Sequence, residues 1–252
     1  MFAEKEWFLG KMTWPEAKEA LLKADCVIIP VGSIEQHGHH IAVGNDVFTP
    51  MEVIRRVVEL SLPKLRLVVT PVVNYGVSEH HMFFPGTVTL KVETFMNVIH
   101  DICRSLIRHG VKRIAVFNGH GGNIGPLTQV LQYRLRREFN VEIMLFNWWT
   151  YFSDMAQPTH ADKVETCVSM YLIPDFVRED KMMKPTKEVW TVDMKEVGWD
   201  AKVSPLVLNI EERTDTGGLP PDPASASREY GKKLVETAVE RISLVLEKTC
   251  KR

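Results

Sequence analysis

The stretch PVGSIEQHGHHIAVGND, residues 30–46, decides how the whole chain is interpreted. It follows the apolar run 26–29 (CVII), whose β-branched content and Pro/Gly boundary predict a buried strand. In an extended segment residues i and i+2 point the same way, so Glu35 and His37 can converge on one site to which Asp46 returns after a turn. Such oxygen and nitrogen donors suit a divalent transition metal. A polar surface loop is the alternative, because a short His-rich tract alone is a weak metal indicator.

These residues resemble the first motif of the creatininase family of metal-dependent amidohydrolases, where a strand leads into G-S-x-E-Q-H-G-x-H-x-x-x-x-x-D. Four further segments match the family in the same order: EHHMFFPGT (79–87), NGHGGN (118–123), HADKVET (160–166) and GGLPPDP (217–223). Because the ordered matches span nearly the whole chain, it is identified as a member of that family. The resemblance implies a three-layer α/β/α sandwich with a mostly parallel central sheet.

Hydrophobic periodicity also predicts an α/β fold. Strands are expected over 26–29, 65–73, 112–117 and 141–149, and helices over 17–24, 51–60, 92–109, 167–173 and 224–248. Strands that alternate with helices indicate a parallel sheet, which places ligands beyond the carboxyl ends of its strands. Residues 178–209 are expected to form a long connection with one or two short strands. We expect one domain over residues 1–252.

Composition narrows the class of partner. The chain has 252 residues, 45% hydrophobic and 25% charged, and is long enough for a substantial core. A formal net charge of −1 without a basic block argues against nucleic acid or an anionic membrane, so a small-molecule substrate is expected. The four cysteines are widely spaced and predict reduced thiols. Without a signal-peptide pattern or an apolar run of transmembrane length, a cytoplasmic location is expected.

Three more residues complete the predicted site. His120 follows the predicted strand 112–117 between glycines that let the backbone approach a ligand, and with the opening motif it becomes the next metal-ligand candidate. For His160 and Glu165 the family resemblance implies a catalytic histidine and an inward-facing glutamate. An acidic residue in an early helical turn, interacting with the helix dipole, is the alternative for Glu165.

The predicted centre holds two divalent ions, Zn, Mn or Fe(II), all of which accept such donors. Asp46 is suited to bridging the ions, and each ion is completed by one carboxylate and one histidine: Glu35 with His120, and Glu165 with His37. Water activated there would attack a polarised carbonyl. Histidine is the usual proton donor near neutral pH, so His160 is predicted to be the general acid for the departing group.

Four residues are predicted to contact the substrate. His81 matches the histidine of the family's H-x-x-F-P-G-T motif, and Gly121 lies within the third family segment. Trp149 belongs to a tryptophan pair that either fills core space or walls the pocket. His39, with His40 and His80, would give the pocket a polar lining.

The sequence is compatible with several classes of substrate. Creatininase itself has a glutamate ligand where this chain has Gly122, a form shared with formamide deformylases and with ring-opening hydrolases of inositol breakdown. The preferred prediction is hydrolysis of a C–N bond in a small cyclic amide or related cyclic carbonyl compound. The alternatives are C–C cleavage of a cyclic diketone, formamide cleavage, or a metal-free binding subunit. Family resemblance also implies a homo-oligomer, specifically a hexamer.

Overall fold

The computed structural model describes residues 7–187, 192–193, 202–203 and 209–251. Its centre is a parallel sheet in the order β2-β1-β3-β4. The strands are β1 (Cys26–Val31), β2 (Leu67–Val69), β3 (Arg113–Asn118) and β4 (Glu142–Asn147). The register places Val31 opposite Asn118, so the carboxyl ends of β1 and β3 lie side by side.

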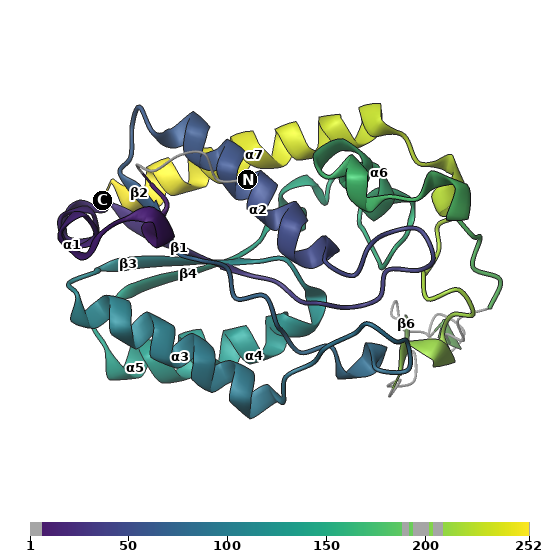
Figure 1. The fold of residues 1–252 in the computed structure, drawn as a ribbon, viewed down its shortest axis with the longest axis horizontal. Helices are drawn as coiled ribbons and strands as arrows, with labels where there is room; N and C mark the ends of the chain where they lie inside the picture. Colours follow the sequence, from purple (N-terminus) through teal and green to yellow (C-terminus); the bar gives the residue numbers. More distant parts are fainter. Residues whose placement is uncertain (1–6, 188–191, 194–201, 204–208, 252) are drawn as a thin grey trace.

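Helices cover both faces of the sheet (Figure 1). On one side lie α2 (Asn45–Ser61), α6 (Lys163–Leu172) and α7 (Arg228–Cys250). The other side carries α3 (Val92–Arg108) and a helical run of α4 (Ile124–Thr128), a π-helical turn η4 (Gln129–Leu135) and α5 (Arg136–Glu138). The short α1 (Trp14–Lys23) lies at the end of the sheet opposite the loops that follow β1 and β3 (Figure 1). The predicted three-layer sandwich is confirmed.

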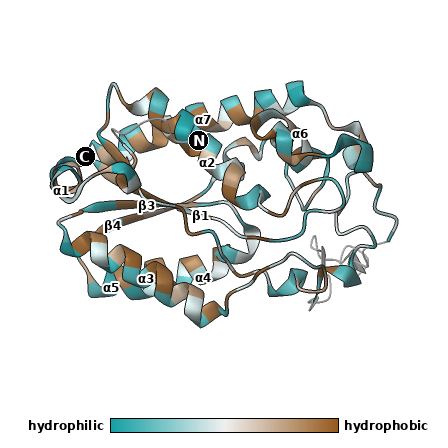
Figure 2. Cartoon of the chain, viewed as in Figure 1, coloured by the Kyte–Doolittle hydropathy of each residue, from teal (hydrophilic) through white to brown (hydrophobic). Residues whose placement is uncertain are grey.

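The two layers of the core follow from the alternation of side chains along buried strands. In β1, Cys26 and Ile28 join the cluster formed with α2 and α7, whereas Val27, Ile29 and Val31 join the cluster formed with α3. Figure 2 shows the hydrophobic sides of these helices turned toward the sheet. A strand covered on both faces has no polar side, which explains why β1 is a continuous apolar run.

Several element boundaries differ from the sequence-based predictions. Helix α2 begins six residues before the predicted start at Met51, and strand β2 is only three residues long. The helical run over 124–138 was not predicted. The connection over 178–209 does contain short strands as predicted, because β5 (Val192–Asp193) pairs antiparallel with β6 (Lys202–Val203). Most of its other residues lie outside the described part of the chain.

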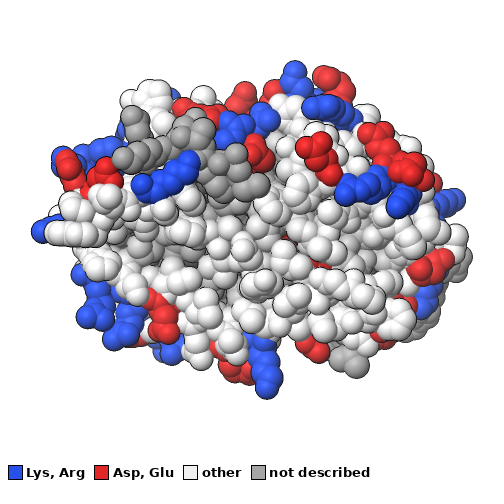
Figure 3. Space-filling view, viewed as in Figure 1, with Lys and Arg blue, Asp and Glu red and all other residues white. Residues whose placement is uncertain are grey.

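The surface carries mixed charge. On the face drawn in Figure 3, acidic and basic side chains lie intermixed toward the edge, around a broad area that carries few of either. Within the described residues, no helix is both long enough and apolar enough to cross a membrane.

Candidate metal centre

The loop after β1 delivers the first two candidate ligands. Glu35 and His37 are each 1% exposed, and a bridge between Ile34 and Val88 fixes the start of this loop. The predicted i, i+2 convergence is present. The extended path then ends, because Gly38 has a positive φ of 62° and the chain turns back so that Ile41 pairs with His37.

Asp46 lies in the first turn of α2, which sits directly over the strand ends. A Cβ atom at Gly32, after β1, would lie 2.6 Å from the Asp46 carbonyl oxygen, and one at Gly119, after β3, would lie 2.3 Å from it. Only glycine permits this approach at both positions. Pro50 has no N–H to bond that carbonyl across one helical turn. Two glycines at neighbouring strand ends therefore position Asp46.

His120 and Glu165 come from opposite sides of the cluster. His120 follows β3 and is buried, and its backbone N–H donates to the Asn118 side chain at 3.2 Å. Glu165 lies in the first turn of α6, whose N-cap Asp162 accepts the Glu165 N–H at 2.8 Å. Ala161 has φ 47°, in the left-handed region, and its N–H donates to the Glu165 carboxylate.

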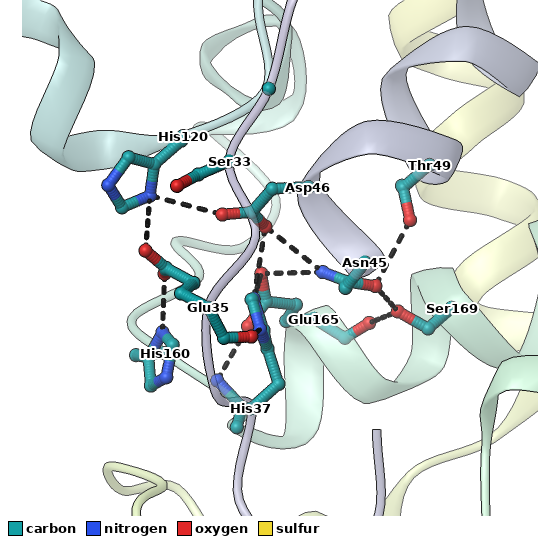
Figure 4. Close-up of polar contacts among 12 residues, drawn as sticks. Ser33, Glu35, His37, Asn45, Asp46, Thr49, His120, His160, Glu165 and Ser169 are labelled. Carbon is teal, nitrogen blue, oxygen red and sulfur yellow. Dashed lines mark hydrogen bonds and ion pairs between the residues drawn. The ribbon is translucent and has the colours of Figure 1, made fainter. Parts of the chain in front are cut away.

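The other four predicted metal ligands meet around Asp46 (Figure 4). Asp46 Oδ1 lies 3.0 Å from His37 Nε2, and Asp46 Oδ2 lies 3.0 Å from His120 Nδ1. Glu35 Oε2 is 3.2 Å from His120 Nδ1, and Glu165 Oε1 is 3.5 Å from His37 Nε2. Each imidazole is thus flanked by the shared aspartate and one further carboxylate.

The histidine orientations fit metal ligation. His37 Nδ1 donates to the backbone carbonyl of Glu35 at 3.0 Å, and His120 Nε2 donates to the carbonyl of Val77 at 3.0 Å. The second nitrogen of each ring then points at the carboxylates. A metal-binding histidine typically donates its other N–H to a carbonyl or carboxylate in this way. Together with three carboxylates, the donor set suits divalent ions.

The pKa shifts within this cluster also fit metal ligation. Burial raises the pKa of Glu35, whereas His37 and His120 outweigh burial and lower the pKa of Asp46. Burial alone would lower the pKa of His120, but Glu35 and Asp46 raise it to about 10. Asp46 and Glu165 likewise raise the pKa of His37 well above its usual value. Both imidazoles are therefore protonated at neutral pH, and a divalent ion would replace those protons.

His160 lies beside the ligands in a small histidine cluster. Its ring centroid is 4.5 Å from that of His37 and 4.4 Å from that of His81, and its Nδ1 is 3.6 Å from Glu35 Oε1. Burial lowers the pKa of His160 well below its usual value, and the neighbouring imidazoles of His37 and His81 lower it further. The ring is therefore neutral at pH 7, so it must gain a proton before it can act as an acid.

A cavity of about 360 Å³ opens over these groups. The predicted substrate contacts His81, Gly121 and Trp149 all line it, as does His80. A Cβ at Gly121 would meet nothing within 4 Å. At Gly122 it would lie 2.3 Å from the Val77 carbonyl oxygen and 2.4 Å from His120 Nε2, so this backbone has no room for a side chain there.

Two histidines of the opening motif lie elsewhere. His39 is exposed and is not among the described cavity-lining residues, so the structure does not bring it to the site. His40 is buried and lies 2.9 Å from the Thr166 hydroxyl, away from the cavity. The turn at Gly38 explains both positions, because the alternation that holds for Glu35 and His37 ends there.

Sequence reasoning missed two residues that hold the site together. The Gln36 amide nitrogen lies 2.9 Å from His81 Nδ1, 3.0 Å from His160 Nε2 and 2.8 Å from the Gly217 carbonyl. With two hydrogens for three acceptors, it can serve only one imidazole while it bonds the carbonyl. Its place between two ligands in the E-Q-H motif was the available signal.

Asn45 is the second missed residue. Its amide nitrogen donates to Glu165 Oε1 at 3.2 Å and to Asp46 Oδ1 at 3.3 Å. Its amide oxygen accepts from Ser169 at 2.7 Å and from Thr49 at 3.1 Å. Asn45 therefore links α2 to α6 and orients both carboxylates (Figure 4).

Comparisons with known proteins agree with this fold and site. The family model described as "Creatininase: Creatinine amidohydrolase" matches residues 10–246. A creatinine amidohydrolase of Pseudomonas putida is 28% identical over 95% of this chain and 95% of its own length. A 3-dehydro-scyllo-inosose hydrolase of Thermotoga maritima is 28% identical over 76% of this chain and 61% of its own. A solved mutant creatininase of the Zn-Zn type is 28% identical, with a TM-score of 0.80 over 97% of this chain and 98% of that one.

The family model covers nearly the whole chain, and the likeness in fold extends over the same residues. The relatives are hydrolases, and the described residues include groups of carboxylates and histidines able to hold a metal ion. The chain therefore belongs to the creatininase family and is a metal-dependent hydrolase.

Proposed function

We propose that this hydrolase opens a small cyclic amide, or a related cyclic carbonyl compound, at a centre of two divalent ions bridged by Asp46. The proposal rests on the two oxygens of the Asp46 carboxylate, each of which faces a different imidazole at 3.0 Å. Glu35 with His120 would complete one ion, and Glu165 with His37 the other. The Zn-Zn title of the solved relative supports zinc in both positions, with Mn and Fe(II) as the alternatives.

The two ions, when bound, would polarise the substrate carbonyl and lower the pKa of the attacking water. His160 would accept the proton of that water and then donate it to the departing nitrogen. This order refines the predicted role of general acid, because burial holds the ring neutral before the reaction. Gln36 contacts both His160 and His81 and would keep the proton carrier beside the ligands.

Cleavage of a carbon–carbon bond in a cyclic diketone is the second candidate. Its support is the likeness to a 3-dehydro-scyllo-inosose hydrolase, together with the imidazoles of His80 and His81 in the cavity wall, which could bond ring hydroxyls. Formamides are a third class to test. They require the same attack on a carbonyl and the same proton donation to a leaving nitrogen.

Metal analysis with a substrate panel tests the proposal. We expect about two divalent ions per chain in wild type and about one in Glu165→Ala, with turnover of at least one member of a panel of cyclic amides, formamides and cyclic diketones. Glu236→Ala, which removes an exposed glutamate on α7, is the control and should change neither value. One ion in wild type that survives Glu165→Ala would rule out the dinuclear arrangement.

We also infer a homo-oligomer, hexameric by family resemblance. Phe83 is 65% exposed, and its neighbour Met82 is exposed as well, next to the loop that carries His80 and His81. Exposed apolar side chains on such a loop are typical of a surface that another chain covers. Sedimentation equilibrium would measure the assembly, and a monomer at micromolar concentration would contradict it.

A further inference from the structure

One cation in the cavity wall has no role in the chemistry above. Among the described residues that line the cavity, Arg213 is the single lysine or arginine. It is half-buried, and its guanidinium forms no hydrogen bond or ion pair with any described residue. An arginine without a partner beside a cavity is free to bind an anion that enters it.

The backbone around Arg213 is well anchored. Its N–H donates to the Ile210 carbonyl at 2.8 Å, at the end of the turn η9 (Ile210–Glu212). That turn is closed by a capping box in which the Asn209 N–H donates to Glu212 at 2.8 Å. It packs against η2 (Glu79–His81), which carries His80 and His81 into the same cavity.

The segment after Arg213 is bonded to the catalytic motifs. Gly217 accepts a hydrogen bond from Gln36 at 2.8 Å, and the Leu219 N–H donates to the His160 carbonyl at 2.8 Å. Within the segment, Thr214 donates to the Gly218 carbonyl. The backbone of Arg213 is therefore fixed relative to His160 and the ligands, so the side chain starts from a defined position in the cavity wall.

Charge in the cavity favours an anionic ligand. The three carboxylates contribute a charge of −3, and two divalent ions would contribute +4, which leaves an excess of one positive charge with neutral imidazoles. Arg213 adds a second positive charge at the wall. A planar guanidinium donates two parallel hydrogen bonds to a carboxylate. A neutral ring without a carboxylate cannot accept such a pair of bonds.

We propose that Arg213 binds a carboxylate of the substrate, so that the preferred substrates are cyclic amides or related carbonyl compounds that carry a carboxylate outside the bond to be cleaved. This inference rests on the proposed function. It makes Arg213 a specificity-determining residue, whereas the ligands and His160 perform the chemistry. The carboxylate would be held at the wall while the ring carbonyl lies over the ligand cluster.

A matched pair of lactams tests the inference. The two probes are 5-oxoproline and 2-pyrrolidinone, which share a five-membered ring and differ by one carboxylate. Their affinities for the metal-loaded protein can be measured by calorimetry, whether or not either is hydrolysed. We expect wild type to bind 5-oxoproline about 10–100-fold more tightly than 2-pyrrolidinone, the scale of one charge-assisted contact. Arg213→Met should remove that preference, and Arg213→Lys should keep part of it.

Arg228→Met is the matched control, because it removes an exposed arginine at the start of α7. It should leave the preference unchanged. A preference that persists in Arg213→Met would show that the metal ions alone bind the carboxylate and would overturn the inference. Equal affinities in wild type, or no binding of 5-oxoproline, would overturn it as well. Metal content measured on the same samples separates the two proposals, since protein without two ions counts against the proposed function and not against Arg213.

Discussion

The two halves of the metal centre are built differently. Glu35 and His120 follow β1 and β3, neighbouring parallel strands, and the side chains are 2% and 4% exposed. Glu165 comes from α6, and its side chain is 20% exposed. Strand register fixes the first half, whereas the second depends on how α6 packs against α2 through Asn45. We therefore expect the Glu35–His120 half to hold its ion more tightly than the His37–Glu165 half.

Replacement of Asp46, the ligand that both halves share, should weaken ion binding in both halves and so abolish the difference in how tightly they hold their ions. Asp46→Asn keeps the shape of the side chain but removes the charge that faces both imidazoles. We expect metal content to fall below one ion per chain and kcat/KM to fall by about 100–1,000-fold, the scale for loss of a preorganised electrostatic group. Retention of two ions in this variant would show that Asp46 does not bridge.

A glycine pair tests whether strand-end packing positions Asp46. In Gly119→Ala the new Cβ would lie 2.3 Å from the Asp46 carbonyl oxygen and 2.6 Å from the Pro50 side chain. The first turn of α2 must then move. We expect a loss of about 1–3 kcal/mol in stability for overpacking, and about a 100-fold loss in kcat/KM from a shift near 1 Å.

Gly121→Ala is the control two residues away, since a Cβ there meets nothing within 4 Å. Its unfolding free energy and metal content should match those of wild type. The two variants are compared by denaturant unfolding and metal analysis, and kcat/KM is measured for Gly119→Ala. Equal behaviour of the variants would show that Gly119 does not set the position of α2.

Local sequence patterns predicted the parts of the site that lie on one segment. Glu35 and His37 could be paired because an extended chain alternates, and His120 because it follows an apolar strand. The alternation fails after Gly38, where a positive φ reverses the chain, so His39 points to solvent. A backbone reversal of this kind is set by the glycine's conformation and is not visible in the spacing of histidines.

Features that depend on contacts between distant segments were not predictable. Asn45 bonds Glu165, 120 positions away, and Arg213 lines a cavity to which Glu35 and His37 also belong. The helical run over 124–138 carries a weak local signal, since Gly125 and Pro126 near its start favour a loop. The helix predicted over 51–60 begins at Asn45 instead, and it tolerates Pro50 because Gly32 and Gly119 accommodate the freed Asp46 carbonyl.

A further expected effect concerns pH and the protons that metal ions replace. In the metal-free protein the pKa of His120 is about 10, above the unfolded value of about 6.5, and that of His37 is also raised. A pKa raised by folding stabilises the protein fully below the unfolded value, and the stabilisation is lost as pH rises toward the folded value. We therefore expect the chelated protein to lose about 2 kcal/mol or more of unfolding free energy between pH 6.5 and 9.5.

Denaturant unfolding across this pH range, with chelator and with saturating metal, measures the effect. The loaded protein should show a much smaller change, because bound ions have already displaced both protons. His39→Asn should behave as wild type, since that ring is exposed outside the cluster. Glu165→Gln should reduce the loss by weakening the pairing of His37 while leaving that of His120 intact. If that variant removed the loss entirely, the Glu35–His120 half would contribute nothing to it, which would contradict the raised pKa of His120.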